Sequence, residues 1–249
     1  MTGPVPTVRQ ADNQLAHVAI IGRGLLARAF NAAELQQLDT TVFASGVSNS
    51  QESDPAQYQR EADLLADALR ACPGRFVYFS TCSVTDDDRA GTPYAVHKRK
   101  MEALIQARGN HLILRLPQVV GNTDNPHTLV NHLVSHIRAG DPLQLWSHAV
   151  RCLVDVDHVA AITMHLLRGG LERDRKLDLA PPESLTLQQL LPLVEETLGQ
   201  QAVYTLIDRG GGATPDSATF CIYAGPAGID ASPGYTRRLL RKYYGAGHD

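Results

Sequence analysis

The sequence predicts an α/β fold built on a doubly wound parallel sheet. Short, nearly continuous apolar runs, typical of strands that are buried on both faces, recur along the chain. They alternate with longer amphipathic stretches of helical periodicity, which is the order expected of strand-helix-strand units. With 249 residues, of which 43% are hydrophobic, the chain can bury one substantial core. We therefore expect one large domain, or one domain with a small additional lobe.

Composition and charge exclude several classes of function. The formal net charge of -3 and the pI near 6.4 provide no basic field that would favour nucleic acid or an anionic membrane surface. No stretch approaches the roughly 18 apolar residues of a membrane span, and the first residues lack the pattern of a signal peptide. The four cysteines lie far apart without a C-x-x-C pair, which predicts reduced core residues rather than a zinc or redox site. These features favour a cytoplasmic protein.

A glycine-rich turn follows the first predicted strand. We expect residues 1–14 to form a disordered tail and residues 17–21 to form the strand. The turn that comes next leads into a helix expected to reach about residue 38, and its sequence is Gly22-Arg23-Gly24-Leu25-Leu26-Ala27. Small residues at such a turn let a pyrophosphate approach the backbone beside the helix N-terminus. Strand, turn and helix together predict a dinucleotide site.

The segment after this turn departs from the usual dinucleotide pattern. A second strand would ordinarily end in Asp or Glu about 20 residues on, where the acid binds the adenosine ribose. Here the next predicted strand covers residues 40–47 and ends in small residues, Ala44, Ser45 and Gly46. The nearest acid, Asp39, precedes this strand and therefore does not lie at its carboxyl end. About one strand-helix unit is missing, together with the determinant that separates NAD from NADP. Arg23 could contact a 2′-phosphate or be a solvated surface residue.

A strand and a helix bring three proton-handling groups toward one place. After a predicted helix at 55–71, residues 75–80 form a buried strand that leads to Thr81. Tyr94 opens the next predicted helix, in which Tyr94 and Lys98 share a face because they are four residues apart. A hydroxyl, a phenol and an ammonium could then act together in proton transfer. Alternatively, Tyr94 and Lys98 are an ordinary exposed helix pair, which is the simpler interpretation of these two residues alone.

The rest of the chain continues the alternation and adds a small lobe. Strands are expected at 111–117, 141–146, 151–157, 176–179 and 202–207, and helices are expected up to residue 138 and at 158–168, 187–198 and 235–244. His132 and His136 share a helix face, but no third ligand and no zinc-protease glutamate accompanies them, so we expect no metal. We divide the chain into the tail, a dinucleotide-binding domain at 15–168 with a substrate-lobe insertion near 122–150, and a C-terminal substrate-binding lobe at 169–249.

Six short motifs occur in the order of a known family. They are the glycine turn, the small residues at 44–46, Ser80-Thr81 before Val84, Tyr94-x-x-x-Lys98, Arg115-Leu116-Pro117-Gln118-Val119-Val120-Gly121, and the stretch from Arg151 to Asp157. With these motifs the chain resembles the extended short-chain dehydrogenase/reductase family of NAD-dependent epimerases and dehydratases. The resemblance covers residues 17 to about 167 and weakens in the last third. It implies a Rossmann-like sheet, and the shortened cofactor site resembles that of compact nucleotide-sugar 4-ketoreductases.

The resemblance implies a role for each matching residue. Tyr94 would exchange a proton with a sugar oxygen, and Thr81 would hydrogen-bond the same oxygen. Lys98 would bind the nicotinamide ribose and lower the pKa of the tyrosine, whose free value is near 10. Gln118 and Arg151 would contact the substrate, the arginine at a nucleotide-sugar phosphate. The residues implied in cofactor binding are Gly22, Arg23, Gly24, Leu25, Leu26, Ala44, Ser45, Gly46 and Pro117.

Three hypotheses for the function follow. The first is an NAD(P)-dependent reductase or epimerase of a nucleotide-linked keto sugar in surface polysaccharide biosynthesis (O-antigen or capsule), with NADP slightly favoured over NAD. The second, which the absent acid motivates, is a non-catalytic Rossmann-like protein that binds a nucleotide or takes part in an assembly. The third is a related enzyme that acts on a non-sugar carbonyl. The first hypothesis requires a nucleotide-sugar substrate, and the family resemblance allows a homodimer.

Overall fold

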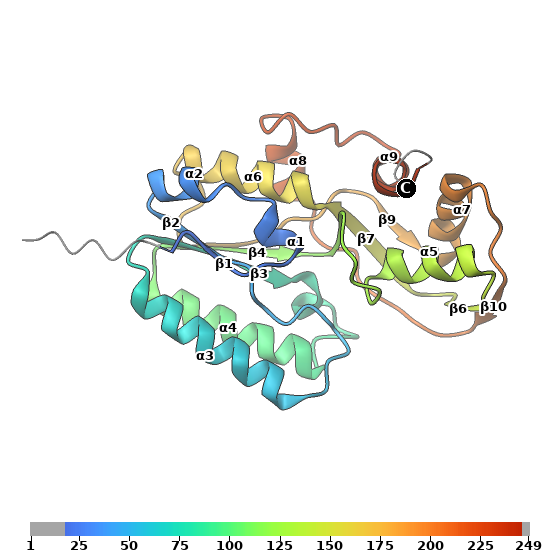
Figure 1. The fold of residues 1–249 in the computed structure, drawn as a ribbon, viewed down its shortest axis with the longest axis horizontal. Helices are drawn as coiled ribbons and strands as arrows, with labels where there is room; N and C mark the ends of the chain where they lie inside the picture. Colours follow the sequence, from blue (N-terminus) through green and yellow to red (C-terminus); the bar gives the residue numbers. More distant parts are fainter. Residues whose placement is uncertain (1–17, 246–249) are drawn as a thin grey trace, which may run out of the picture.

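A five-stranded parallel sheet is the centre of the larger part of the molecule (Figure 1). The computed structural model describes residues 18–245, so the tail expected at 1–14 lies outside the described residues. The strands lie in the order β1 (Ile20–Ile21), β2 (Thr40–Phe43), β3 (Arg75–Thr81), β4 (His111–Leu116) and β8 (Arg175–Asp178). Every neighbouring pair is parallel, so all carboxyl ends lie along one edge. The predicted α/β fold with a parallel, Rossmann-like sheet is confirmed.

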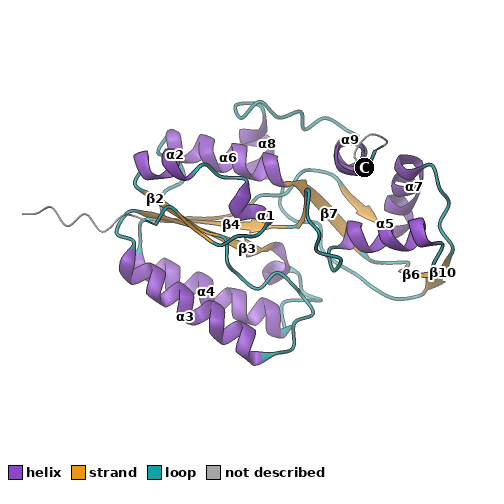
Figure 2. Ribbon diagram, viewed as in Figure 1, coloured by secondary structure: helices purple, strands orange, loops and turns teal. Residues whose placement is uncertain are grey.

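Helices cover both faces of this sheet (Figure 2). On one face lie α3 (Pro55–Ala71) and α4 (Pro93–Arg108), and on the other lie α1 (Leu25–Arg28), α2 (Ala32–Gln37) and α6 (Val156–Arg168). Within β3, Phe76 and Tyr78 pack in the cluster with α3 and α4, whereas Val77 and Phe79 pack in the cluster with α2 and α6. This alternation is the two-residue period of a strand. Because both faces are buried, the strands read in the sequence as continuous apolar runs.

Local signals account for where the helices begin. The Asp54 side chain accepts a hydrogen bond from the N–H of Ala56, and Pro55 occupies the first position of α3, which begins at the residue predicted for this helix. The single helix expected up to residue 38 is instead divided into α1 and α2. The Asn31 side chain accepts from the N–H groups of Ala33 and Glu34 and so starts a new helix. The helix that follows the glycine turn, α1, is therefore only four residues long.

The edge position of β1 shows where the fold is shortened. In the usual doubly wound order, 3-2-1-4-5-6, two strands lie beyond the first one. Among residues 18–245 nothing occupies these two positions, so the shortening, expected to be about one strand-helix unit, amounts to two strands. The chain leaves β1 toward the face of α2 but leaves β2 toward the face of α3. A crevice between diverging connections at the carboxyl ends of strands is where open α/β sheets bind ligands.

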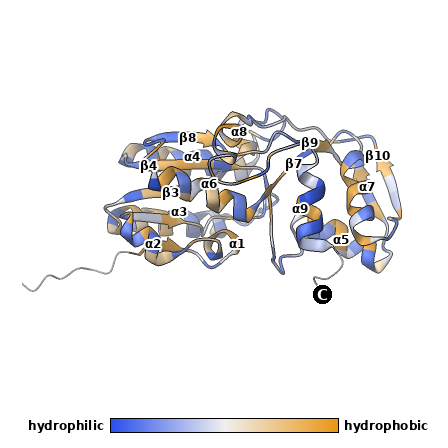
Figure 3. Ribbon diagram, turned by 90° about the horizontal axis from the view of Figure 1, so that it is seen from above, coloured by the Kyte–Doolittle hydropathy of each residue, from blue (hydrophilic) through white to orange (hydrophobic). Residues whose placement is uncertain are grey.

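A smaller lobe lies at the other end of the long axis (Figure 3). One of its sheets contains β5 (Gln118–Val120), β7 (Val150–Asp155) and β9 (Ser184–Thr186), and the other contains β6 (Leu143–Trp146) and β10 (Tyr204–Ile207). Three helices pack there: α5 (Leu129–Ala139), α7 (Leu187–Leu198) and α9 (Tyr235–Tyr244). The expected division at residue 169 needs a correction. After α6 the chain returns to the main sheet, because β8 supplies hydrogen bonds to the open edge of β4 and α8 (Ala218–Ala224) contacts α6.

Two further expectations can be compared with the fold. Three cysteines, Cys72, Cys82 and Cys152, are buried as expected, whereas Cys221 is exposed on α8 and is not a core residue. None of the described helices combines the length and the apolar character needed to cross a bilayer.

Candidate active site

A cavity of about 1480 Å³ opens along the carboxyl ends of the main-sheet strands and extends into the lobe. Its lining includes these residues singled out in the sequence: Arg23, Gly24, Leu25, Leu26, Ala44, Ser45, Gly46, Thr81, Tyr94, Lys98, Pro117, Gln118 and Arg151. Gly22 lies just behind this wall, where a Cβ would come within 2.4 Å of the Ala44 carbonyl oxygen. The residues expected to bind cofactor, transfer protons and contact substrate therefore share one cavity.

The glycine turn leaves room for a phosphate group. Gly22 has a φ of +132°, and its contact with Ala44 shows that the loops after β1 and β2 pack directly on each other. A Cβ on Gly24 would have no neighbour within 4 Å, so the open space in front of this residue belongs to the cavity. A pyrophosphate requires such a bare backbone, and the turn therefore fits a dinucleotide. Because α1 is short, the fit rests on the backbone of the turn rather than on a long helix dipole.

Tyr94 and Thr81 meet at the cavity wall. Thr92 caps α4 and places Tyr94 in its first turn, beside the end of β3 that carries Thr81. The Thr81 hydroxyl lies close enough to the Tyr94 phenol to favour its ionised form. Burial and the nearby Glu61 carboxylate raise the pKa of Tyr94, and the interaction with Thr81 only partly opposes this rise. The resemblance implied a lowering of this pKa by Lys98, so the direction found here is the opposite.

Lys98 is buried, and its ammonium is fully engaged inside the protein. Its Nζ donates to the two carboxylate oxygens of Glu61, at 2.9 and 3.2 Å, and to the Tyr78 hydroxyl, at 3.2 Å. An ammonium has three protons, and these contacts account for all of them. Nζ also lies 5.7 Å from the ring centroid of Tyr94, which keeps its charge beside the phenol. If Lys98 also binds the nicotinamide ribose, as the resemblance implied, one of these three protons must be shared between its present acceptor and a ribose oxygen.

Glu61, which no sequence motif indicated, is the centre of this cluster. Its side chain is completely buried. It accepts hydrogen bonds from the Tyr78 hydroxyl and from the Val47 N–H, both at 2.7 Å, and its Oε2 lies 3.1 Å from Nε2 of His97. Burial by itself would raise the pKa of Glu61. The contacts with His97, Lys98, Tyr78 and Val47 outweigh burial, so the pKa lies well below its usual range.

The sequence did carry a signal for Glu61. Glu61, Leu65 and Ala68 are spaced by four and three residues and form the buried stripe of α3. A carboxylate in an otherwise apolar stripe requires a buried partner, because an unpaired charge is costly to remove from water. The partner itself could not be identified, since Lys98 lies 37 residues away on another helix.

Gly46 lies directly against the Glu61–Lys98 pair. A Cβ on Gly46 would be 2.4 Å from Lys98 Nζ and 2.9 Å from Glu61 Oε1. We expect Gly46→Ala to displace the ammonium and to reduce turnover by about 100-fold, the usual effect of misplacing a reacting group by about 1 Å. Steady-state kinetics with circular dichroism would measure this. Gly225→Ala, at the residue that directly follows α8, is the control, because a Cβ there meets nothing within 4 Å. Wild-type turnover in Gly46→Ala would contradict the expectation.

Arg151 and Arg89 form a cationic part of the cavity wall. Arg151 Nη1 donates to the Val150 carbonyl oxygen at 2.7 Å, and among the described residues no carboxylate forms an ion pair with Arg151. Burial and the neighbouring Arg89 lower the pKa of Arg151 to about 10. Arg89 is itself 3.6 Å from Asp86. Two neighbouring guanidinium groups with one nearby carboxylate favour an anionic ligand such as a phosphate.

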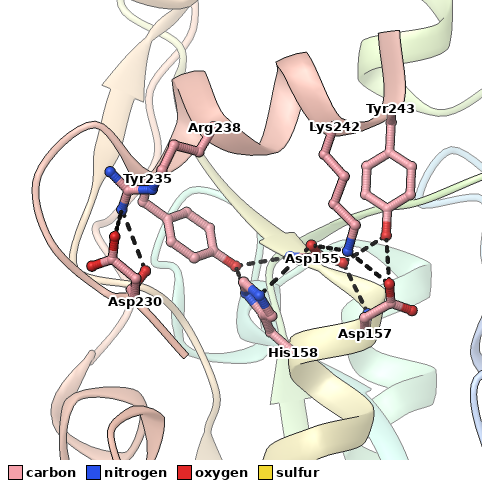
Figure 4. A network of polar contacts seen from close by, with 8 residues as sticks. All are labelled: Asp155, Asp157, His158, Asp230, Tyr235, Arg238, Lys242 and Tyr243. Carbon is pink, nitrogen blue, oxygen red and sulfur yellow. Dashed lines mark hydrogen bonds and ion pairs between the residues drawn. The ribbon is translucent and has the colours of Figure 1, made fainter. Parts of the chain in front are cut away.

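The C-terminal helix holds the strand that carries Arg151 (Figure 4). Asp155, at the end of β7, accepts hydrogen bonds from Lys242 Nζ at 2.8 Å and from the Tyr243 hydroxyl at 2.7 Å. Lys242 also binds Asp157, in the first turn of α6, and the Tyr235 hydroxyl accepts the N–H of Asp155. Asp155 is buried. The network therefore fixes α9 on the junction of β7 and α6, and so connects the lobe to the main sheet.

Comparison with known protein families matches most of the chain. The profile described as the NAD dependent epimerase/dehydratase family matches residues 4–176. The chain belongs to this family. It is accordingly an enzyme of the NAD-dependent oxidoreductase/epimerase type, which confirms the family resemblance that the six motifs indicated. A search of curated proteins finds no match to this chain.

Three solved structures illustrate the fold that this chain shares with other proteins. UDP-glucuronic acid 4-epimerase from Bacillus cereus, in complex with UDP-glucuronic acid and NAD, is 18% identical with a TM-score of 0.65, over 84% of this chain and 76% of that one. UDP-N-acetylglucosamine 4-epimerase from Methanobrevibacter ruminantium M1, in complex with UDP-N-acetylmuramic acid, is 15% identical with a TM-score of 0.68, over 82% and 74%. RMD from Pseudomonas aeruginosa, complexed with NADPH, is 19% identical with a TM-score of 0.65, over 82% and 81%.

Proposed function

We propose that this protein is a cytoplasmic NAD(P)-dependent reductase or epimerase that acts on a nucleotide-linked keto sugar in surface polysaccharide biosynthesis. The observation that carries the proposal is that Thr81, Tyr94 and Lys98 line the same cavity as the glycine turn and Arg151. Several structures of similar fold contain a nucleotide sugar, NAD or NADPH, which supports this class of ligands. A homodimer in solution belongs to the same proposal.

Each side chain has one task in the proposed reaction. Tyr94 exchanges a proton with a sugar oxygen, which the Thr81 hydroxyl also hydrogen-bonds. Because its pKa is raised, Tyr94 stays protonated near neutral pH and is better suited to donate a proton, as in carbonyl reduction, than to accept one. The Lys98 charge stabilises the phenolate once the proton has left. Arg151 binds a nucleotide phosphate, and Gln118 contacts the sugar. A nicotinamide, when bound, supplies or accepts the hydride.

The proposal is tested by titrating the protein with NADPH and NADH and following nicotinamide fluorescence. We expect at least one dinucleotide to bind below millimolar concentration. Assays with nucleotide-linked 4-keto sugars and with small ketones then separate a sugar enzyme from an enzyme of other carbonyls. Absence of binding by both dinucleotides at millimolar concentration would exclude the proposed activity.

Two arginines favour NADP over NAD. Arg23 and Arg60 are exposed, line the cavity, and have no ion-pair partner within residues 18–245. The carboxylates of the cavity lining are Asp86, which follows β3, Asp178, which ends β8, and Asp216, which follows later in the chain. None of them lies in the loops after β1 and β2. A 2′-phosphate near these loops would therefore meet positive charge without acidic competition.

For the double variant Arg23→Ala/Arg60→Ala we expect the Kd of NADPH to rise about tenfold, since two exposed charged contacts of roughly 0.5 to 1 kcal/mol each are lost and about 1.4 kcal/mol corresponds to a factor of ten. The Kd of NADH should change little. Fluorescence titration measures both constants, and Arg70→Ala, which removes another exposed arginine of α3, is the control. Equal weakening of NADH and NADPH would show that the arginines bind the shared pyrophosphate instead.

A further inference from the structure

A buried carboxylate beneath the loop after β2 has no assigned role in the proposed reaction. Glu61 contacts neither the cavity lining at Arg151 nor the glycine turn, yet it binds the lysine of the Tyr94–Lys98 pair. We propose that Glu61 is a positioning residue, which fixes the Lys98 ammonium beneath the loop at residues 44–47 and couples this loop to the Tyr94–Lys98 pair. The inference rests on the proposed function, because it concerns how the proton-handling pair is held.

The contacts of Glu61 connect four separate segments. Oε1 accepts from Lys98 on α4 and from Tyr78 on β3, and Oε2 accepts from the Val47 N–H in the loop. A carboxylate that uses both oxygens in this way has one orientation in which every partner is satisfied. Gly46 extends the coupling, because the ammonium occupies the space of its absent side chain. A shift of the loop therefore shifts Glu61, and with it Lys98.

The surroundings of Lys98 indicate that Glu61 is its main counter-charge. Arg60 acts against the lysine charge, and Glu102 acts in its favour but more weakly than Glu61. The remaining polar groups that face Lys98 are the phenols of Tyr78 and Tyr94. Within the described part of the chain, Glu61 alone forms an ion pair with Lys98. Removing its charge leaves a buried ammonium without a counter-ion.

A second buried carboxylate supplies a matched control. Glu102 lies on α4 and is almost completely buried, like Glu61. It binds Arg115 through both oxygens at 2.8 Å and accepts from the Ser80 hydroxyl. It makes no hydrogen bond or ion pair with Lys98 or with the loop at 44–47. Glu61→Gln and Glu102→Gln therefore remove similarly buried charges, but only the first removes direct contacts with Lys98 and the loop, and the charge of Glu102 acts on Lys98 more weakly.

The first experiment follows the ionisation of Lys98 by NMR of protein labelled with ¹³C at lysine Cε, the resonance being assigned by its loss in Lys98→Met. In Glu61→Gln we expect Lys98 to lose its proton about 1 to 3 pH units lower than in the wild type, the range typical of losing an adjacent opposite charge. In Glu102→Gln its titration should stay near the wild-type value. Equal shifts in the two variants, or no shift in Glu61→Gln, would overturn the proposal.

The second experiment separates position from charge by means of Glu61→Asp. This variant keeps the charge but shortens the side chain by one methylene, so it cannot reach Lys98 and the Val47 N–H together. We expect Lys98 to remain charged in the NMR titration while kcat falls at least about tenfold, as for a displaced catalytic group. A wild-type kcat in Glu61→Asp would show that charge alone suffices and would refute the positioning role.

The pH profile adds a readout that a purely structural role would not change. Carbonyl reduction needs a protonated Tyr94 and a charged Lys98, and Glu61 raises the pKa of both groups. The alkaline limb of the profile should therefore move to lower pH in Glu61→Gln and stay in place in Glu102→Gln.

If the wild type binds no dinucleotide, the proposed function fails while the NMR titration still decides the role of Glu61. If the wild type is active and the two Gln variants behave alike, only the role of Glu61 fails.

Discussion

Replacement of Tyr94 by Phe is expected to lower turnover by about 10²- to 10⁴-fold, the contribution of a positioned general acid. The ring would still fill the first turn of α4, and the Lys98 ammonium would keep its bonds to Glu61 and Tyr78. Only the phenol oxygen, which interacts with the Thr81 hydroxyl, would be lost. Dinucleotide affinity should therefore change little, because the glycine turn is untouched.

Single-turnover kinetics and fluorescence titration of the same Tyr94→Phe preparation measure the two effects separately. Tyr223→Phe is the control, since the Tyr223 hydroxyl donates to Glu172 on the far side of the main sheet and also loses one phenol hydrogen bond. We expect wild-type rates for the control. A Tyr94→Phe enzyme with more than about a tenth of wild-type turnover would mean that another group transfers the proton.

The raised pKa of Tyr94 illustrates what a sequence can and cannot predict about a site. The spacing of Tyr94 and Lys98 correctly placed both residues in the first part of one helix, since four residues is one turn. The direction in which the pKa of Tyr94 shifts depends on burial and on Glu61, which lies on a different helix. No local pattern contains this information, so the family resemblance suggested a lowering that the folded environment reverses.

The elements of the main sheet were predictable where the signal is local. Asp54 and Pro55 start α3 because an N-cap and a proline act within a few residues. The return of β8 to the sheet was not predictable, since its pairing with β4 depends on an edge formed some 60 residues earlier in the chain. The glycine run at 210–212 carries no local signal in the sequence other than that of a flexible loop. In the fold it packs closely, and a Cβ on Gly210 would be 2.9 Å from the Ala149 nitrogen.

A second large effect is expected for the stability of Lys98→Met. The variant leaves the Glu61 carboxylate buried without its ammonium partner, and we expect the free energy of unfolding at pH 8 to fall by about 3 to 5 kcal/mol. Urea unfolding followed by circular dichroism measures this change. Arg168→Met, which removes one partner of the exposed pair with Glu34, is the control and should cost less than about 1 kcal/mol.

The pH dependence of this loss follows from the ionisation of Glu61. In the wild type the folded-state pKa of Glu61 lies below its unfolded value, so the pair contributes its full stability above the unfolded pKa and loses it as the pH falls. In Lys98→Met one of the groups that lower the folded-state pKa of Glu61 is lost, while the contacts with His97, Tyr78 and Val47 remain, so this pKa is higher than in the wild type. The difference between the two proteins should therefore be largest at pH 8 and should shrink as the pH falls through the folded-state pKa of Glu61 in the variant.

The double variant Lys98→Met/Glu61→Gln shows whether the penalty comes from the unpaired charge. It buries no ion, so its stability should lie closer to the wild type than that of either single variant. The side-chain amide that replaces the Glu61 carboxylate could still accept the Val47 N–H through its carbonyl oxygen, which keeps the loop attached. Additive losses in the double variant would mean that Glu61 and Lys98 stabilise the fold independently. Such a result would also weaken the coupling of loop and lysine, because this coupling requires that the two side chains act as one buried pair.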